Sequence, residues 1–427
     1  MIVSSLHLLR QLGFRCPVRL REACCLLLLL CHVCSACAYI LVFGPLVLIF
    51  SLLNCRRQGY SLASAAYGWW MHGLAFFVEK VAGTEFVLSL DHASHPFQGA
   101  DNHNNNHNHN HKHDRPLEPT LSRSSTVTDL ESLPRRAFVM CNHLSECDWL
   151  FICCLAARVQ GALGGLRFVL KRSIGHVPLV GWALQMMHFV FIDRCWRTDE
   201  GAMGATLQQL RACVGHEERH GEHEEGHKEW RMERHEEQQQ KQSQKQGSGF
   251  WLAIFPEGTD FTDRKRDACQ EFARSRGLPV LNHVLLPRTR GTYLCLHSLH
   301  AVFEAVIDVT VAYDKGKGTL PDLVKMAIGR GPRRVLLHLK TLPVDAPRAL
   351  RQHSFNEAMF DIYSRKDTLL SQVYATGRMP ASTSTACSLH PPTVVGFASL
   401  ALSGLITITI TTYMCTLVLL QKEHDWW

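Results

Sequence analysis

Charged residues are scarce in this chain: they make up only 19% of its 427 residues, and the net charge is +7. An excess this modest argues against nucleic-acid binding and suits anionic lipid or phosphate partners. Collagen-like periodicity is absent and 46% of residues are hydrophobic, which excludes a fibrous or wholly disordered protein. The 17 cysteines are scattered along the chain, so a small disulfide scaffold is excluded as well. A Gly-x-Ser-x-Gly motif is also absent, which argues against a serine hydrolase.

Charge is missing altogether from the apolar segment Ala23–Leu53, which is longer than the roughly 20 residues that one membrane span needs. Arginines lie on both sides of it, and the positive-inside rule favours both flanks in the cytosol. A tilted single helix accounts for the length, whereas a re-entrant hairpin bent near Gly44 and Pro45 accounts for the charges. We expect the hairpin. A signal peptide cleaved near Ala36–Ala38 is the competing interpretation.

A second uncharged apolar segment, Val394–Leu420, is also long enough to span a membrane. We therefore expect an integral membrane protein, with the lipid bilayer as a partner. The residues before Glu22 include arginines and no acid, a composition that also occurs in mitochondrial targeting segments. Cys31, Cys34 and Cys37 have a metal-like spacing, but inside an apolar helix we expect them to pack as small hydrophobic residues.

Two low-complexity tracts interrupt the rest of the chain. Residues 101–114 are rich in His and Asn and lead into a Ser/Thr/Pro-rich stretch to residue 134, while residues 215–249 are rich in His, Glu and Gln. Neither can bury a core, so both are expected to be disordered insertions. The second contains two matches to a zinc-peptidase pattern, His216–His220 and His223–His227, which such a composition yields by chance. Loose, non-catalytic metal binding is the alternative role for the histidines.

Short apolar runs alternate with helical patterns between these tracts. The expected strands are Ala137–Met140, Phe168–Leu170, Phe189–Ile192, Phe250–Phe255, Val280–Leu286, Ile307–Ala312 and Val335–Leu339. The expected helices are Ser145–Arg158, Gly201–Val214, Asp263–Arg276 and Ala349–Tyr374. This alternation predicts an α/β fold with a largely parallel sheet flanked by helices.

The composition suggests the following division of the chain. We expect a membrane anchor or re-entrant hairpin over residues 1–60, an amphipathic lead-in over 61–100, a low-complexity insertion over 101–134, a catalytic domain over 135–345, a helical tail over 346–392 and a transmembrane helix over 393–421.

Four polar clusters follow apolar strands, and in parallel sheets the chemistry lies in the loops at the carboxyl ends of strands. The first cluster, Asn142–Trp149, contains a His and an Asp five residues apart across a helix start. There the Asp can orient the imidazole and leave the other ring nitrogen as a general base. The alternative is that Ser145 and Asp148 only cap the helix.

The other three clusters have the same position relative to a strand. Asp193 and Arg194 end the run Phe189–Ile192, where they can form a salt bridge or bind a phosphate. Pro256–Asp260 places a glutamate between turn-forming residues. Pro287–Arg290 closes an apolar run with a proline and two cations.

Together, the four clusters resemble the signature of the glycerolipid acyltransferase superfamily, the lysophosphatidate and lysophospholipid acyltransferases that use acyl-CoA. That signature runs from Asn-His and a downstream Asp, through a Phe-Ile-Asp-Arg-like block and Phe-Pro-Glu-Gly-Thr, to a Pro-Arg block. The resemblance covers about Arg136–Leu342, with a hydrophobic anchor at each end. It implies a glycerol-3-phosphate acyltransferase-like fold.

The resemblance also implies a role for each matching residue. His143 would be the general base that takes the proton from the acceptor hydroxyl, with Asp148 orienting it, and that hydroxyl would attack the acyl-CoA thioester directly. The implied substrate-binding residues are Asn142, Asp193, Arg194, Glu257, Gly258, Thr259, Pro287 and Arg288. Acyl-CoA and a lysophospholipid are then the substrates, and no metal or other cofactor is expected.

Asp260 departs from the commoner signature, which has Arg or Ser after Phe-Pro-Glu-Gly-Thr. With Gly181–Gln185 and Ile307–Tyr313, it resembles the lysocardiolipin and lysophosphatidylinositol branch, so we expect Asp260 to select a hydroxyl-rich head group. We predict an acyl-CoA-dependent O-acyltransferase that acts on lysophosphatidylinositol or lysocardiolipin in phospholipid remodelling. The alternative acceptor is 1-acyl-sn-glycerol-3-phosphate (lysophosphatidate), which would give phosphatidate.

Two other classes of function stay open on the residues alone. One is a hydrolase with Ser145 as nucleophile beside His143, and the other is a non-catalytic membrane scaffold that uses the histidine tracts. The resemblance implies the endoplasmic reticulum as the location, with a mitochondrial membrane as the alternative.

Overall fold

The structure is a computed structural model that describes residues 18–92, 133–215, 249–313, 320–344, 352–379, 384–385 and 393–424. The histidine-rich tracts lie outside these residues. The zinc-peptidase-like matches lie outside them as well. The disorder and the loose metal binding expected of the tracts therefore stay predictions.

An eight-stranded mixed sheet forms the centre of the fold, in the order β4-β3-β5-β2-β6-β7-β1-β8. Its strands are β1 (Glu85–His92), β2 (Arg136–Cys141), β3 (Leu166–Lys171), β4 (Val190–Ile192), β5 (Phe250–Ile254), β6 (Ala305–Tyr313), β7 (Arg334–Pro343) and β8 (Ser384–Thr385). Neighbours from β4 to β6 are parallel, β7 is antiparallel to β6, and β1 is parallel to β7. The expected α/β fold with a largely parallel sheet is confirmed.

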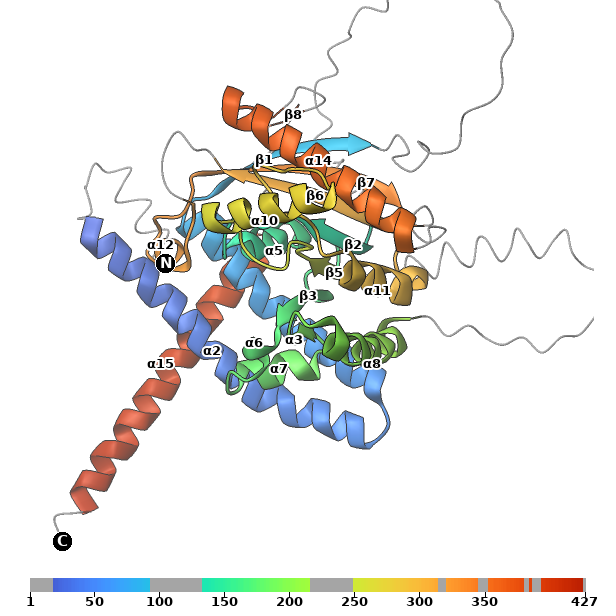
Figure 1. Cartoon of the computed structure of the whole chain (residues 1–427). Helices are drawn as coiled ribbons and strands as arrows, with labels where there is room; N and C mark the ends of the chain where they lie inside the picture. The colour runs from blue at the N-terminus through green and yellow to red at the C-terminus, as the bar shows by residue number, and fades with distance from the viewer. Residues whose placement is uncertain are drawn as a thin grey trace, which may run out of the picture.

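Helices cover both faces of this sheet (Figure 1). They are α3 (Arg56–Phe76), α5 (Asp148–Ala156), α6 (Arg172–Gly175), α7 (Val180–Met186), α8 (Trp196–Val214), α10 (Asp263–Arg276), α11 (Thr289–Leu299), α12 (Leu323–Ala327) and α14 (Gln352–Thr376). One hydrophobic cluster joins the sheet to α3 and α5, and a second joins its other face to α8, α11 and α14. Because both faces are buried, the central strands read as continuous apolar runs.

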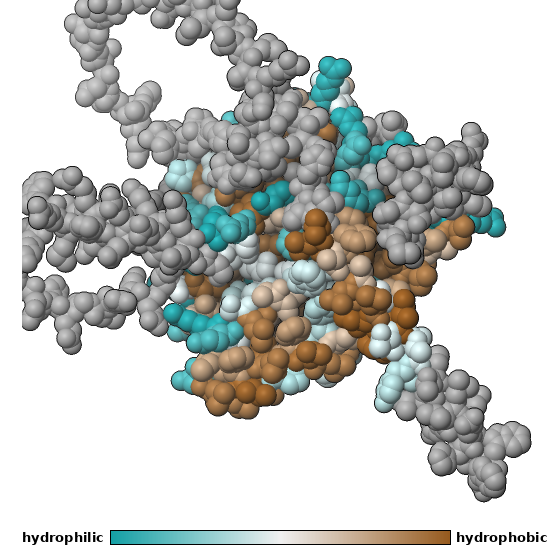
Figure 2. Space-filling view, turned by 180° about the vertical axis from the view of Figure 1, so that it is seen from behind, coloured by the Kyte–Doolittle hydropathy of each residue, from teal (hydrophilic) through white to brown (hydrophobic). Residues whose placement is uncertain are grey.

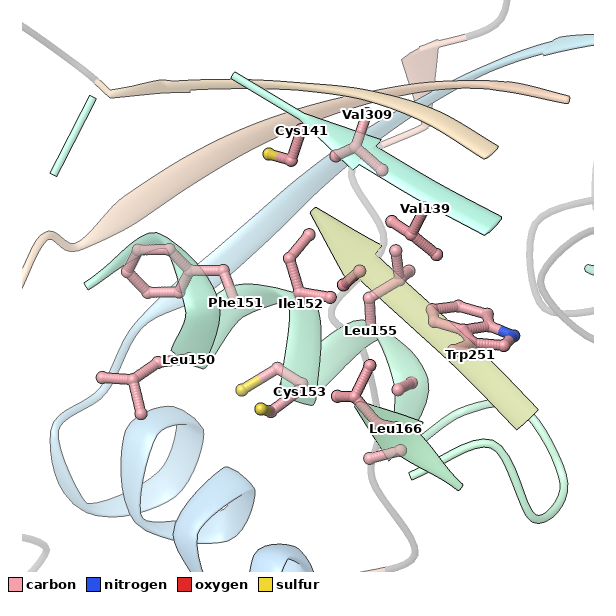
Figure 3. Close-up of a cluster of buried hydrophobic side chains, with 14 of the residues drawn as sticks. Val139, Cys141, Leu150, Phe151, Ile152, Cys153, Leu155, Leu166, Trp251 and Val309 are labelled. Carbon is pink, nitrogen blue, oxygen red and sulfur yellow. The ribbon is translucent and has the colours of Figure 1, made fainter. Parts of the chain in front are cut away.

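The cluster beneath α5 shows how the strands share this core (Figure 3). Alternate residues of β2, β5 and β6 point to the same face, where they meet the apolar side of α5. The labelled members are Val139, Cys141, Leu150, Phe151, Ile152, Cys153, Leu155, Leu166, Trp251 and Val309. Burial of this face fixes α5, whose first residue is Asp148.

The sheet differs from the sequence prediction at two places, one strand that was wrongly predicted and one that was missed. Val280–Leu286 is not a strand, because its backbone N–H groups bond to side chains: Leu285 donates to Glu257 and Leu286 donates to Cys269. Strand β1 was not predicted, and it lies in the segment expected as an amphipathic lead-in, paired with β7 over its whole length.

Two helices are long and apolar enough to cross a membrane, within α2 (Val18–Leu52) and α15 (Thr393–His424). Only 11% of the most apolar window of α2 and 22% of that of α15 are buried inside the protein, so these are not core helices of a soluble domain. Figure 2 shows apolar side chains gathered over the lower part of the molecule, where these helices meet the domain.

The expected hairpin at Gly44 and Pro45 is wrong, because α2 continues as one helix through both residues. A long apolar helix tolerates a proline, because side chains, neighbouring helices or local adjustments of the helix can satisfy the carbonyl group that loses its N–H partner. The chain leaves the helix only after Leu52, and α3 then packs against both α2 and α15.

A polar cluster joins the three helices α2, α3 and α15. The His32 ring bonds to Ser403 Oγ at 2.9 Å and to the Trp70 carbonyl at 3.0 Å, and it stacks on the Trp70 ring. Ser35 also bonds to Ser403, at 2.9 Å. At Gly73 a Cβ atom would lie 2.4 Å from His32 Cε1, so only glycine allows this close approach.

A buried ion pair connects α5 to the N-terminal helical segment of residues 18–81, which we call the anchor. Glu79 belongs to the short π-helix η1 (Phe77–Val81) that continues α3, and its carboxylate pairs with the Arg158 guanidinium just beyond α5. Both side chains are at most 6% exposed. The end of the anchor is thus tied to the helix that begins with Asp148.

Candidate functional site

The carboxyl ends of parallel strands bring the four polar clusters to one edge of the sheet. His143 follows β2, Asp193 and Arg194 follow β4, and Glu257 follows β5. These strands run in the same direction, so their carboxyl ends meet at one edge. Arg288 is held at the same edge, since its N–H donates to the Pro256 carbonyl at 2.7 Å.

His143 and Asp148 form the dyad that the spacing predicted. His143 Nδ1 lies 2.9 Å from Asp148 Oδ2. A carboxylate can only accept, so Nδ1 carries the proton and Nε2 is the basic nitrogen. Asp148 is fully buried, whereas the His143 side chain is 19% exposed. The imidazole thus reaches the surface while its partner stays shielded from water.

Two further donors hold the Asp148 carboxylate. Oδ2 also accepts the Ser145 N–H at 2.9 Å, and Oδ1 accepts the hydroxyl of Tyr313, the last residue of β6. Sequence reasoning gave Tyr313 no place in the site. Its position at the carboxyl end of a strand parallel to β2 was the available signal.

The ring of Phe255 covers one face of His143. The two ring centroids are 4.4 Å apart and the planes are 25° from parallel. The His143 carbonyl in turn accepts the Phe261 N–H at 2.7 Å. The imidazole is therefore fixed both by its ring contact and by its backbone.

Glu257 is a buried acceptor that ties two loops together. Its Oε1 accepts the His143 N–H and its Oε2 accepts the Leu285 N–H, each at 3.0 Å. Burial raises the pKa of Glu257 to about 8, and the two N–H bonds act to lower it. Glu257 thus fixes the backbone position of His143, the candidate general base.

Asn142 is also buried, and both the nitrogen and the oxygen of its side-chain amide form a hydrogen bond. Its side-chain N–H donates to the Val311 carbonyl at 3.1 Å, and its side-chain oxygen accepts the Val311 N–H at 2.8 Å. The amide therefore pairs with β6 like an added strand residue and holds the start of the His143 loop.

Thr259 and Asp260 form a small network with Lys265 of α10. Lys265 Nζ lies 2.7 Å from Asp260 Oδ1 and 2.9 Å from Thr259 Oγ1. Partial burial acts to raise the pKa of Asp260, but the hydrogen bond and charge of Lys265 outweigh it and hold that pKa below its usual value. Asp260 is therefore an ionised, paired carboxylate.

Gly258 makes room for Arg288. Its φ of +71° lies in the left-handed region, and a Cβ atom there would lie 3.0 Å from Arg288 Cδ. Arg288 is exposed, whereas Pro287 before it is buried. The guanidinium stem thus passes directly over the turn that carries Glu257.

Asp193 and Arg194 do not pair with each other. Asp193 Oδ2 accepts from Arg172 Nε at 2.5 Å, and the Asp193 N–H donates to Asp199 at 2.7 Å. Arg194 has a φ of +67° and is exposed, with no ion pair to any described residue. Its guanidinium is therefore available to an anion.

The Ser145 hydroxyl forms two hydrogen bonds within the fold. It donates to the Pro321 carbonyl at 2.5 Å and accepts the Cys147 N–H at 3.0 Å. The residue is 4% exposed. The hydroxyl proton is therefore directed to the Pro321 carbonyl and not toward His143.

Comparison with known proteins gives a consistent result. A family model described as Acyltransferase matches residues 124–289. The probable 1-acyl-sn-glycerol-3-phosphate acyltransferase 5 of Arabidopsis thaliana is 31% identical over 246 residues, which cover 57% of this chain and 55% of the relative. The 1-acyl-sn-glycerol-3-phosphate acyltransferase delta of Macaca fascicularis is 28% identical over 336 residues, which cover 78% of this chain and 66% of the relative.

The chain spans about half the length of the first of these relatives. A 1-acyl-sn-glycerol-3-phosphate acyltransferase 2 from Brassica napus gives the same picture, with 31% identity over 57% of this chain and 53% of the relative. A comparison with solved structures found no significant match.

Proposed function

Because the folded domain of this chain belongs to the glycerolipid acyltransferase superfamily, we propose that it transfers an acyl chain from acyl-CoA to the free hydroxyl of a lysophospholipid. The observation that carries the proposal is the dyad of His143 and Asp148. It leaves one basic ring nitrogen at the surface, at the edge where the parallel strands end.

In the proposed reaction, His143 Nε2 takes the proton of the acceptor hydroxyl as its oxygen attacks the thioester carbonyl carbon. The new C–O bond forms, the C–S bond breaks, and the CoA thiolate takes the proton back from His143. Asp148 stabilises the imidazolium between these steps and keeps the ring in one tautomer. No metal ion takes part in these steps, and no cofactor beyond the acyl-CoA co-substrate is needed.

Two exposed guanidinium groups, Arg194 and Arg288, support a phosphate-bearing acceptor. Neither pairs with an acid among the described residues, and both lie at the edge that holds His143. Guanidinium groups bind phosphate oxygens in a bidentate manner. We assign Asn142 and Glu257 to positioning the loops and not to contact with the acceptor, since both are buried and occupied.

The names of the relatives favour the alternative acceptor over our first prediction. They are 1-acyl-sn-glycerol-3-phosphate acyltransferases, so we propose lysophosphatidate in place of lysophosphatidylinositol or lysocardiolipin. The pairing of Asp260 with Lys265 supports this choice, because the ammonium group neutralises a carboxylate that would otherwise repel a phosphate monoester.

The proposed setting is a membrane, entered by α2 and α15, and the endoplasmic reticulum is the compartment we propose. The hydrolase alternative is less well supported, because the Ser145 hydroxyl bonds to Pro321 and not to His143.

The test uses membranes that contain the full chain, labelled oleoyl-CoA and three acceptors: lysophosphatidate, lysophosphatidylinositol and monolysocardiolipin. We expect transfer to lysophosphatidate, its loss in His143→Ala, and its retention in His297→Ala, which removes an exposed histidine of α11. Transfer that survives His143→Ala would overturn the general base. Release of CoA without an acceptor would instead support the hydrolase.

A further inference from the structure

The segment between β3 and β4 carries an unusual exposed apolar patch on α6, α7 and the loop between them. Trp182 is 59% exposed, and Ile174, Val177 and Val180 are 37% to 45% exposed. Pro178 is exposed beside them. We call these five residues the α6–α7 surface.

The backbone holds these side chains outward. A Cβ atom at Gly181 would lie 2.2 Å from the Gly175 carbonyl oxygen, so the two helices touch through their glycines. Gln185 Nε2 donates to the same carbonyl at 2.7 Å. Leu179 adopts a φ of +64°, which a leucine takes up only when its surroundings enforce it. Backbone contacts thus fix the outward position of the side chains in the α6–α7 surface.

This surface is continuous with the apolar helix α2. Helix α7 contacts α2, and Figure 1 shows α6 and α7 beside its middle part. In its C-terminal half, α2 exposes Leu41, Val42 and Leu46 to its surroundings. An apolar face that continues a candidate membrane span meets the same medium as the span.

Exposed basic side chains lie in the segments that adjoin the α6–α7 surface and lead to the candidate site. Lys171 precedes α6, Arg194 follows β4, and Arg197 lies in the first turn of α8, all of them exposed. Apolar side chains with a tryptophan, bordered by Lys and Arg, are typical of segments at the boundary between lipid head groups and acyl chains. The cations attract the anionic head groups there.

We propose that the α6–α7 surface lies in the head-group region of the membrane that α2 enters. The strand ends with Arg194 would then face the lipid from which an acceptor arrives. The membrane contact itself rests on the exposed side chains, the contact of α7 with α2 and the bordering cations, whereas its use for acceptor entry rests on the proposed function.

Site-specific photocrosslinking tests this contact without any need for acyl transfer. The photoreactive residue p-benzoylphenylalanine replaces Trp182, Val177 or, as a control, Phe272 in the full chain, and membranes with radiolabelled phospholipid are irradiated. Phe272 is an aromatic residue of α10 that is 52% exposed, and Figure 1 shows α10 in the upper part of the domain, away from α7.

We expect at least about five-fold more lipid label on the chain with the probe at 182 or 177 than at 272. Label no greater than the 272 control at both positions would overturn the proposal, as would crosslinks from them to a protein in place of lipid. All three replaced side chains are exposed, so the core is unchanged. Acyl transfer measured on the same membranes reports the proposed function separately.

Discussion

Asp148 accepts hydrogen bonds from His143, Ser145 and Tyr313, and both oxygens of this fully buried carboxylate have a donor. A buried carboxylate is costly unless donors surround it. The hydroxyl of Tyr313 therefore helps to keep Asp148 ionised and in place beside the imidazole. Tyr313 acts through Asp148, which makes it a positioning residue.

Tyr313→Phe removes only this hydroxyl. A hydrogen bond to a charged group contributes about 1.5–3 kcal/mol, so we expect kcat for acyl transfer to fall by about 10-fold or more, with KM for the acceptor little changed. The matched control is Tyr293→Phe on α11, whose ring packs on Phe355. Equal kcat values for the two variants would show that Tyr313 does not support the dyad.

Glu257→Gln replaces an acceptor oxygen with an N–H donor that faces a backbone N–H. We expect the free energy of unfolding to fall by about 1–3 kcal/mol and acyl transfer to weaken, since the His143 loop loses one anchor. Thermal unfolding in detergent measures the first effect and initial rates measure the second.

We also expect the difference in stability between the wild type and Glu257→Gln to depend on pH. The pKa of Glu257 is raised to about 8 in the folded protein, so between the ordinary glutamate pKa and pH 8 the unfolded chain has lost this proton and the folded chain has kept it. The contribution of Glu257 to stability therefore declines as the pH rises through this window and is level above it. The advantage of the wild type over Glu257→Gln should shrink from pH 5 to pH 8. An advantage that grows over this range would contradict the raised pKa.

At the scale of elements, the sequence predicted the helices and strands whose caps and apolar residues lie within or directly beside the element itself. Helix α10 lies where its pattern predicted, Asp263–Arg276, because Thr262 caps its start and Gly277 ends it with a φ of +63°. The buried parallel strands were visible as short apolar runs. The four polar clusters could be placed because each directly follows such a run.

The prediction of a strand at Val280–Leu286 was wrong because the partners of its backbone N–H groups cannot be read from the local sequence. Its N–H groups bond to side chains far away in sequence: Asp367 accepts from Asn282 and His283, and Glu257 accepts from Leu285. Tyr313 was missed for the same reason, since its partner Asp148 lies 165 residues before it.

Helix α14 shows how such a distant contact acts on the sheet. Lys366 reaches into the core, where its Nζ lies 2.6 Å from Asp308 of β6 and donates to the Val309 carbonyl. Lys366→Met would leave Asp308 buried without its cation, at a cost of about 3–5 kcal/mol in the free energy of unfolding. The double variant Lys366→Met/Asp308→Asn should recover part of this loss. Equal unfolding temperatures for the single and double variants would show that the pair is not coupled.

At the scale of the whole molecule, the histidine-rich tracts lie between complete elements. Strand β1 ends at His92 before the first tract, and helix α8 ends at Val214 before the second. Deletion of residues 101–114 and 216–248 should therefore leave acyl transfer within about two-fold of the full chain, because the dyad and its supports are retained. Loss of transfer in a variant that still folds and stays in the membrane would favour the scaffold interpretation.

The anchor and the α/β domain are less separable than their composition suggests. Glu79 belongs to the anchor side of the chain and Arg158 to the domain, and each is the buried counter-charge of the other. Removal of the Glu79 carboxylate alone would leave the Arg158 guanidinium buried without its counter-charge, at a cost of about 3–5 kcal/mol from a total that is commonly only about 5–15 kcal/mol. Trimming the chain back to β1 to obtain a water-soluble enzyme would in addition expose the apolar side chains of α5 that pack against α3. The anchor is therefore a non-modular part of the protein, and a soluble version would need Arg158 redesigned together with the cut.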